Sequence, residues 1–160
     1  FRDDPNTIRA LFVAAGIGQV IATRASIAGA SGGCQAEIGS ASAMAAGALV
    51  YLRGGSCEQI LNAVAMSLKN LLGLVCDPVS GLVEVPCVKR NVIGAVNAMS
   101  AADMALAGIQ SMIPADQVID AMKEVGDLMD VSLRETGRGG LAATRRGVEI
   151  RERLQGETAE

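Results

Sequence analysis

Apolar residues recur at helical spacing through most of the chain, and this pattern predicts a series of helices. Asp4 followed by Pro5 fits the start of the first helix, because aspartate caps helix N-termini and proline is favoured at the first helical position. The helical pattern then continues to about residue 27. Ser56 with Gln59 three residues later has the spacing of a capping box and predicts the start of another helix.

Glycine and proline divide the rest of the pattern into further elements. A glycine-rich turn is expected at residues 28–34. Residues 72–90 contain two glycines and two prolines, which a helix does not accommodate, so we expect an irregular loop there, beside the 28–34 turn. The predicted helices are, in chain order, residues 5–27, 35–52, 56–71, 91–109, 114–129 and a charged terminal helix from residue 144.

The composition agrees with a helical bundle. Half of the residues are hydrophobic, yet the only aromatic residues are Phe1, Phe12 and Tyr51, and the chain has 19 glycines. Small side chains let helices pack closely, and the alternation typical of strands is rare here. The predicted fold class is therefore all-α: a compact bundle of about six or seven helices with an irregular cysteine-bearing loop, in one domain spanning residues 1–160.

Charge and the lengths of the apolar stretches limit the classes of partner. A net charge of −3 with scattered signs lacks the basic patch that a nucleic-acid surface needs. The apolar stretch 38–52 is shorter than the ~20 residues that span a bilayer. The start of the sequence has no basic segment typical of a signal peptide. We therefore expect a cytoplasmic protein with no nucleic-acid partner and no membrane partner.

Three of the four cysteines lie where the helical pattern breaks. Cys34 follows a glycine pair, Cys76 precedes Asp77-Pro78, and Cys87 follows Pro86, whereas Cys57 lies beside a helix cap. Glycine-rich turns suit cluster-ligating thiolates, because backbone amides can approach the sulfur. The separations match no short metal-binding signature, however, and on spacing alone buried packing cysteines are the better interpretation.

Two longer motifs change this interpretation. Residues 31–39 read SGGCQAEIG, and residues 76–87 read CDPVSGLVEVPC, followed by Arg90-Asn91. Together with Glu135-Thr136 and the run GGLA at 139–142, they resemble the α-chain of iron–sulfur-dependent L-serine dehydratases. The resemblance extends from about residue 27 to residue 143, which is most of the chain.

This resemblance implies a lyase of serine catabolism and gluconeogenesis that converts L-serine to pyruvate and ammonia. In such enzymes an all-α domain holds a [4Fe–4S] cluster through three cysteines, which correspond here to Cys34, Cys76 and Cys87. Cys57 is then a structural cysteine. Three ligands leave one iron open as a Lewis acid for the departing hydroxyl, so the resemblance implies no pyridoxal phosphate.

Polar residues within or near the motifs are the candidate contacts for L-serine. Ser31 with the amides of Gly32 and Gly33 is a candidate for binding the substrate carboxylate, and so are Lys89 and Arg90. Asn70, Asp77 and Asn91 are candidates for orienting the amino group. Each of these residues also has an ordinary structural explanation, such as a turn or a helix end. The candidates are Ser31, Gly32, Gly33, Asn70, Asp77, Lys89, Arg90 and Asn91.

The resemblance also implies parts that this sequence lacks. The family enzyme has a regulatory-type β domain or subunit and further catalytic residues upstream, and it is expected to be a homo- or hetero-oligomer. Because the sequence begins at Phe1 and contains no histidine, we expect a fragment of a longer chain. The base that removes the α-proton is then expected outside it, and the fragment alone is expected to be inactive.

Two other functions stay open from the sequence. One is a non-catalytic helical interaction module whose cysteines only pack, which iron and sulfide analysis would distinguish. The other is a different cluster-dependent hydro-lyase that acts on a hydroxy dicarboxylate, which an additional pair of arginines at the site would favour.

Overall fold

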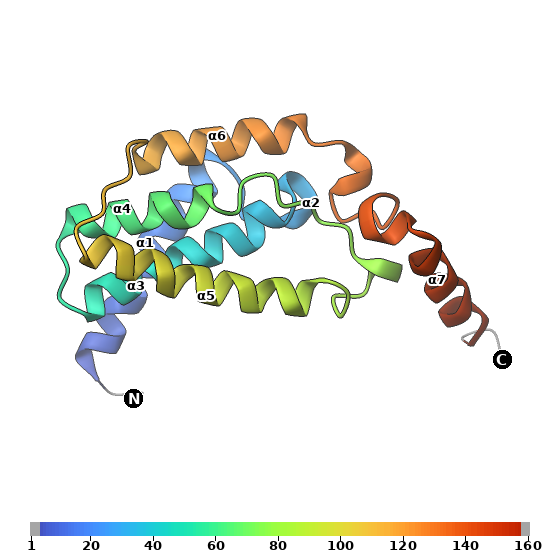
Figure 1. Cartoon of the computed structure of the whole chain (residues 1–160), viewed down its shortest axis with the longest axis horizontal. Helices are drawn as coiled ribbons and strands as arrows, with labels where there is room; N and C mark the ends of the chain where they lie inside the picture. Colours follow the sequence, from blue (N-terminus) through green and yellow to red (C-terminus); the bar gives the residue numbers. More distant parts are fainter. Residues whose placement is uncertain (1–3, 158–160) are drawn as a thin grey trace.

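The computed structural model describes residues 4–157, and this part of the chain contains seven α-helices (Figure 1). They are α1 (Pro5–Arg24), α2 (Gly29–Gly32), α3 (Ser40–Leu52), α4 (Cys57–Lys69), α5 (Cys87–Leu106), α6 (Ala115–Leu128) and α7 (Arg145–Glu157). Shorter helical turns are η1 (Gln35–Gly39), η2 (Val79–Gly81), η3 (Val131–Leu133) and η4 (Gly140–Ala143). Within the described residues the only β pairing is an isolated bridge between Cys76 and Arg134, so the predicted all-α fold is confirmed.

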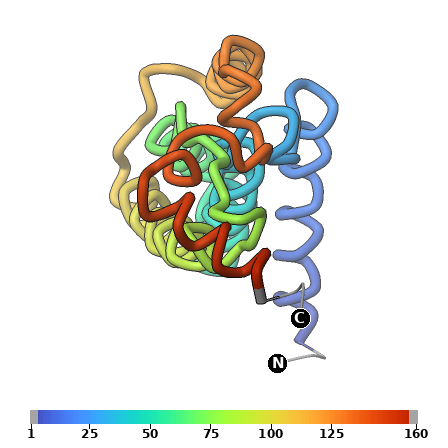
Figure 2. Tube along the Cα trace, turned by 90° about the vertical axis from the view of Figure 1, so that its right-hand side faces the viewer, coloured from blue at the N-terminus to red at the C-terminus, as the bar shows by residue number. Residues whose placement is uncertain are grey.

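Helix α3 lies at the centre of the bundle and packs against α1, α4 and α5. Helix α4 also packs against α5 and α6, while α7 extends from one end of the bundle and contacts only the η2 and η4 turns closely (Figure 1). Viewed along the bundle, α1 lies on one side of the other helices (Figure 2). Two buried apolar clusters fill the contacts between these helices. One lies between α1, α3, α4 and α6, and the other between α3, α4 and α5.

Small residues on α3 explain how three helices approach it. Ala43, Ala46 and Gly47 are buried there, and a side chain at Gly47 would overlap the side chain of Ile17 on α1. A Cβ at Gly47 would also lie 3.3 Å from the Ile60 side chain of α4. The alanine- and glycine-rich composition therefore acts at helix contacts, as the sequence predicts.

The predicted helix starts are confirmed in detail. Asp4 accepts a hydrogen bond from the Asn6 amide at 3.1 Å, and Pro5 is the first residue of α1. The capping box of α4 has both of its bonds, from the Gln59 amide to Ser56 Oγ at 3.2 Å and from the Ser56 amide to Gln59 Oε1 at 2.9 Å.

Several boundaries differ from the prediction. Helix α1 ends at Arg24, the 28–34 turn contains the short helix α2, and residues 35–39 form a π-helical turn before α3. The irregular loop ends at Pro86 rather than at residue 90, because a proline can stand at the N-terminus of a helix and α5 begins directly after it. The loop does lie beside the 28–34 turn as expected, since the Gln35 amide donates to the Leu74 carbonyl at 2.8 Å.

By length and composition α1 is apolar enough to cross a membrane. In this structure it packs along α3 and is joined to α6 by Arg24, which donates to Asp120 at 2.7 Å. One helix of this kind is weak support for a membrane span, because core helices of soluble bundles share its composition. The absence of a membrane partner stays a prediction.

The side chain of Gln35 joins three segments at the end of the bundle that carries the cysteine loop. It is 1% exposed, its Nε2 donates to the Met122 carbonyl of α6 at 2.9 Å, and its Oε1 accepts from the Gly73 amide at 2.9 Å. The Gly73 amide has no backbone partner among the described residues, so it depends on this side chain, whereas the Met122 carbonyl lies inside α6.

We expect Gln35→Ala to destabilise the fold, because it removes two side-chain hydrogen bonds and leaves the Gly73 amide without its protein partner. Hydrogen bonds of this kind contribute about 0.5–1.5 kcal/mol each, so the free energy of unfolding should fall by about 1–3 kcal/mol in urea denaturation. The control is Gln110→Ala on the exposed segment between α5 and α6. This substitution should change the free energy of unfolding by about 0.5 kcal/mol or less. Equal losses from the two substitutions would contradict the role given to Gln35.

Candidate functional site

Three of the four cysteines lie at one end of the bundle, and two of them, Cys34 and Cys76, are in contact. Cys34 precedes η1, Cys76 lies in the loop after α4, and Cys87 is the first residue of α5. The side chains of Cys34 and Cys76 are buried against each other and against Ile38, and Cys87 interacts electrostatically with both. Cys57 is exposed at the first residue of α4, at the opposite end of that helix from the cysteine loop (Figure 1).

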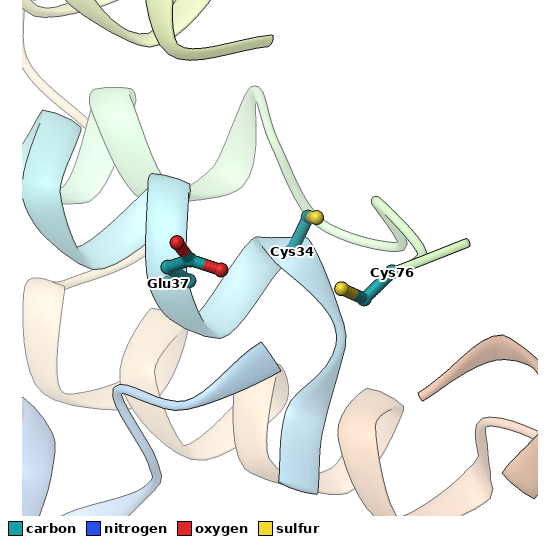
Figure 3. A group of neighbouring side chains, drawn as sticks. All are labelled: Cys34, Glu37 and Cys76. Atoms are coloured by element: carbon teal, nitrogen blue, oxygen red, sulfur yellow. The ribbon is translucent and has the colours of Figure 1, made fainter. Parts of the chain in front are cut away.

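Two thiols and a carboxylate form the tightest group of possible metal ligands in the described residues. The Sγ atoms of Cys34 and Cys76 and a carboxylate oxygen of Glu37 all lie within 4.8 Å of one another (Figure 3). Glu37 lies on the π-helical turn η1, and π-helical turns occur frequently at functional sites.

The position of Cys34 depends on Gly33. Gly33 has φ +76°, a left-handed conformation that glycine adopts readily, and it ends α2. A Cβ at this position would come within 2.7 Å of the Met129 side chain and 2.9 Å of the Leu74 carbonyl oxygen. Conformation and space therefore both require glycine before Cys34.

Cys76 is held by the backbone of the segment after α6. Its amide donates to the Leu133 carbonyl at 2.8 Å, and its carbonyl accepts from the Glu135 amide at 2.7 Å. Glu135 has φ +64°, which is uncommon for a residue other than glycine. The motif Glu135-Thr136 thus acts through its main chain at Cys76.

A buried ion pair fixes the loop between Cys76 and Cys87. The Asp77 side chain is 3% exposed, and Arg90 Nη1 donates to its Oδ1 at 2.7 Å, to the Val75 carbonyl at 2.8 Å and to Cys34 Sγ at 3.9 Å. The other oxygen, Oδ2, accepts from the Leu141 amide at 2.7 Å. A side chain at Gly140, which has φ +57°, would overlap Asp77, so this glycine permits the contact.

The surroundings of Cys76 and Cys87 favour the neutral form of these two thiols. Burial raises the pKa of Cys76, and the adjacent Cys34 raises it further. Burial also raises the pKa of Cys87, together with the charges of Cys34 and Glu37, and Arg90 only partly opposes this shift. A bound metal centre reverses this balance, because thiolate is the form that ligates metals.

Of the predicted carboxylate contacts, Ser31, Gly32 and Gly33 are engaged within their own turn. Ser31 Oγ makes a short hydrogen bond with Ser26 Oγ, and the Gly32 and Gly33 amides donate to the Ala28 and Gly29 carbonyls at 3.0 and 2.8 Å. A substrate carboxylate would have to displace these amide bonds, and the predicted substrate role of the three residues stays a prediction.

The other predicted contacts divide between the site and the rest of the bundle. Asp77 and Arg90 are at the site, but each is occupied by the other. Asn70 donates to Asn97 of α5 at 2.9 Å, Asn91 donates to the Cys87 carbonyl at 3.0 Å, and Lys89 is exposed on the first turn of α5. Their substrate contacts stay predictions.

Sequence reasoning missed Gly29. A Cβ at this position would come within 3.1 Å of Cys76 Sγ and 3.2 Å of Glu37 Oε2, so glycine lets the backbone of α2 pass close to both the thiol and the carboxylate. Residues 28–34 read as an ordinary glycine-rich turn, and no signal in the sequence distinguishes Gly29 from the other glycines there.

The donors suit an iron–sulfur centre. Cys34 and Cys76, in contact, and Cys87 at the same end of the bundle offer soft sulfur ligands, and Gly29 and Gly33 let the backbone approach the sulfur atoms closely. Cys34, Cys76 and Cys87 are the residues that would hold such a centre, and Cys57 lies too far along α4 to join them.

Comparison with known proteins agrees with the resemblance seen in the motifs. The family model described as serine dehydratase alpha chain matches residues 2–142. The chain is 64% identical over 149 residues to the "Probable L-serine dehydratase, alpha chain" of Bacillus subtilis (strain 168), covering 93% of this chain and 50% of that protein. It is 56% identical over 149 residues to the L-serine dehydratase, alpha chain, of Peptoniphilus asaccharolyticus, covering 92% of this chain and 51% of that one.

A further relative is longer. The chain is 47% identical over 140 residues to L-serine dehydratase 1 of Escherichia coli (strain K12), covering 86% of this chain and 31% of that protein. The chain thus spans about half the length of the two alpha-chain relatives and less than a third of this one. Because the family model matches most of its residues, this chain belongs to the serine dehydratase alpha chain family.

Proposed function

We propose that this chain is the cluster-binding catalytic part of an L-serine dehydratase that converts L-serine to pyruvate and ammonia. The observation that supports the proposal is the contact between Cys34 and Cys76, with Cys87 at the same end of the bundle, in a member of this family. The three cysteines would hold a [4Fe–4S] cluster. When bound, the cluster would supply an open iron as Lewis acid for the hydroxyl group that leaves.

The residues of this chain contribute position and charge. Arg90 donates toward Cys34 Sγ, and Asp77 keeps the guanidinium in place. Ile38, Leu71 and Leu74 pack around Cys34 and Cys76 and exclude water from that side of the sulfur atoms. Because water is excluded from the protein side of the site, the local dielectric constant is low there and electrostatic interactions are stronger.

In the proposed reaction serine loses its hydroxyl as water and its α-proton to a base. The resulting aminoacrylate tautomerises and hydrolyses to pyruvate and ammonia, without pyridoxal phosphate. The chain has no histidine, and Asp77 is occupied by Arg90 and by the Leu141 amide. We propose that the base lies in a part of the enzyme that these 160 residues do not include.

Partners follow from the lengths of the relatives. Because the alpha-chain relatives are about twice as long and the Escherichia coli relative is longer still, we propose that this chain works with a further catalytic segment and with a β domain or subunit. A homo- or hetero-oligomer in the cytoplasm is part of the same proposal.

A hydro-lyase for hydroxy dicarboxylates is the weaker alternative. A second substrate carboxylate would need a cationic partner at the site. The Arg90 guanidinium, which contacts Cys34, is already paired with Asp77. Serine needs no second cation. The substrate proposed here therefore fits the described charges better.

We expect Cys76→Ser to abolish the intact cluster after anaerobic reconstitution, because it removes one of three sulfur ligands. Cys57→Ser should leave iron and sulfide content and the visible absorption at the wild-type level, since Cys57 is exposed and lies away from the site. Iron and sulfide analysis of both variants measures this. Equal losses would contradict the ligand assignment, and a wild-type chain that takes up no iron would support a module with packing cysteines.

We also expect the reconstituted 160-residue chain to produce no pyruvate from L-serine in an anaerobic assay. The physical reason is that the α-proton must be taken by a base within hydrogen-bond reach, and the chain lacks the usual candidate. The comparison is an intact L-serine dehydratase at equal cluster content. Turnover within about tenfold of that enzyme, ~1.4 kcal/mol in the barrier, would place the base in this chain.

A further inference from the structure

Glu37 presents a carboxylate directly at the cysteine group. One of its oxygens lies within 4.8 Å of the Sγ atoms of both Cys34 and Cys76 (Figure 3). Its neighbours on the η1 turn, from Gln35 to Gly39, are buried, but the Glu37 side chain is exposed. A small molecule arriving at the thiols from solvent therefore meets this carboxylate.

The Glu37 carboxylate has no cationic partner of its own. Within residues 4–157 it takes part in no ion pair and accepts no hydrogen bond. The guanidinium of Arg90, which contacts Cys34, is engaged by Asp77 and by the Val75 carbonyl instead. A carboxylate beside sulfur ligands thus lacks a counter-charge that the described part of the chain could supply.

The backbone of α2 passes close to this carboxylate on the side of Cys76. A Cβ at Gly29 would come within 3.2 Å of Glu37 Oε2 and 3.1 Å of Cys76 Sγ, which is tighter than ordinary van der Waals contact. Gly29 has no left-handed backbone conformation that would require glycine, so its small size is what permits this close approach. The carboxylate of Glu37 and the thiol of Cys76 thus lie side by side against the same backbone.

We propose that the exposed carboxylate of Glu37 is the subsite that binds the α-ammonium group of an amino-acid substrate. The proposal rests on the function proposed above. Serine carries one cationic group, on the carbon next to the one that bears the hydroxyl, so the ammonium must bind close to the point where the hydroxyl reacts. The sulfur ligands and the substrate carboxylate are anionic, and Glu37 is the carboxylate that lies within reach of both thiols.

This subsite makes the site selective for amino hydroxy acids. A carboxylate that binds an ammonium group through charge-assisted hydrogen bonds discriminates strongly against an analogue without that group. 3-Hydroxypropanoate keeps the hydroxyl and carboxylate of serine but has no amine, so it should gain nothing from Glu37. Residue and ligand can therefore be changed independently.

The test measures equilibrium binding to the anaerobically reconstituted chain, followed by the ligand-induced change in its visible spectrum and by calorimetry. L-Serine and 3-hydroxypropanoate are the two ligands. Glu37→Gln removes the charge at nearly constant size, Glu37→Asp retains it on a shorter side chain, and Glu58→Gln is the control. Glu58 is likewise exposed and follows Cys57 at the far end of α4.

We expect Glu37→Gln to weaken L-serine binding by roughly ten- to a hundredfold, as for the loss of a charged hydrogen bond, and to leave 3-hydroxypropanoate binding and iron content unchanged. Glu37→Asp should recover part of the loss, and Glu58→Gln should bind both ligands as the wild type does. Equal binding of L-serine by Glu37→Gln and wild type would overturn the subsite. So would an equal loss for both ligands, or a loss of iron, which would make Glu37 a general or metal-binding residue.

Failure of the proposed function has a different signature. A wild-type chain that takes up no cluster, or one that binds neither ligand, would overturn the dehydratase proposal and the subsite with it. A wild type that binds L-serine, beside a Glu37→Gln variant that does so equally well, would overturn the subsite alone.

Discussion

The buried carboxylate of Asp77 is the interaction on which the geometry of the site depends. A carboxylate removed from water is stable only when it is paired and hydrogen-bonded, and Asp77 meets this requirement with Arg90 and the Leu141 amide. Its two oxygens thereby fix the irregular loop to α5 on one side and to the η4 turn on the other. Cys76 and Cys87 lie at the two ends of that loop, so their separation follows from this anchor.

The third thiol is placed by different forces at the same end of the bundle. Gly33 turns the chain before Cys34, and the buried Gln35 ties the following turn to α6 and to Gly73. Burial keeps the pKa of Cys76 and of Cys87 raised, so both thiols hold their protons until a metal centre displaces them. The apolar bundle and the polar anchors thus together hold the three cysteines at one end of the bundle.

Local chemistry explains which features the sequence could predict. The caps at Asp4 and Ser56 and the proline- and glycine-rich loop act over a few residues, and the structure bears them out. Other features depend on contacts between distant segments, which no local pattern encodes. They are the π-helical turn, the pairing of Cys76 with residues 133–135 and the close approach of the backbone at Gly29 to Cys76 and Glu37. The anchoring role of Asp77 is of the same kind, because its partners come from two other segments, and its predicted substrate contact stays a prediction.

The central claim is that the three converging cysteines hold a cluster with one iron open to serine. An anaerobic Mössbauer spectrum of the iron-reconstituted chain, recorded during a titration with L-serine, tests it most directly. The account predicts a four-iron cluster in which serine changes the signal of a single iron site, with the same cluster in Cys57→Ser. A chain that takes up no cluster, or a cluster whose spectrum does not respond to serine, would contradict it.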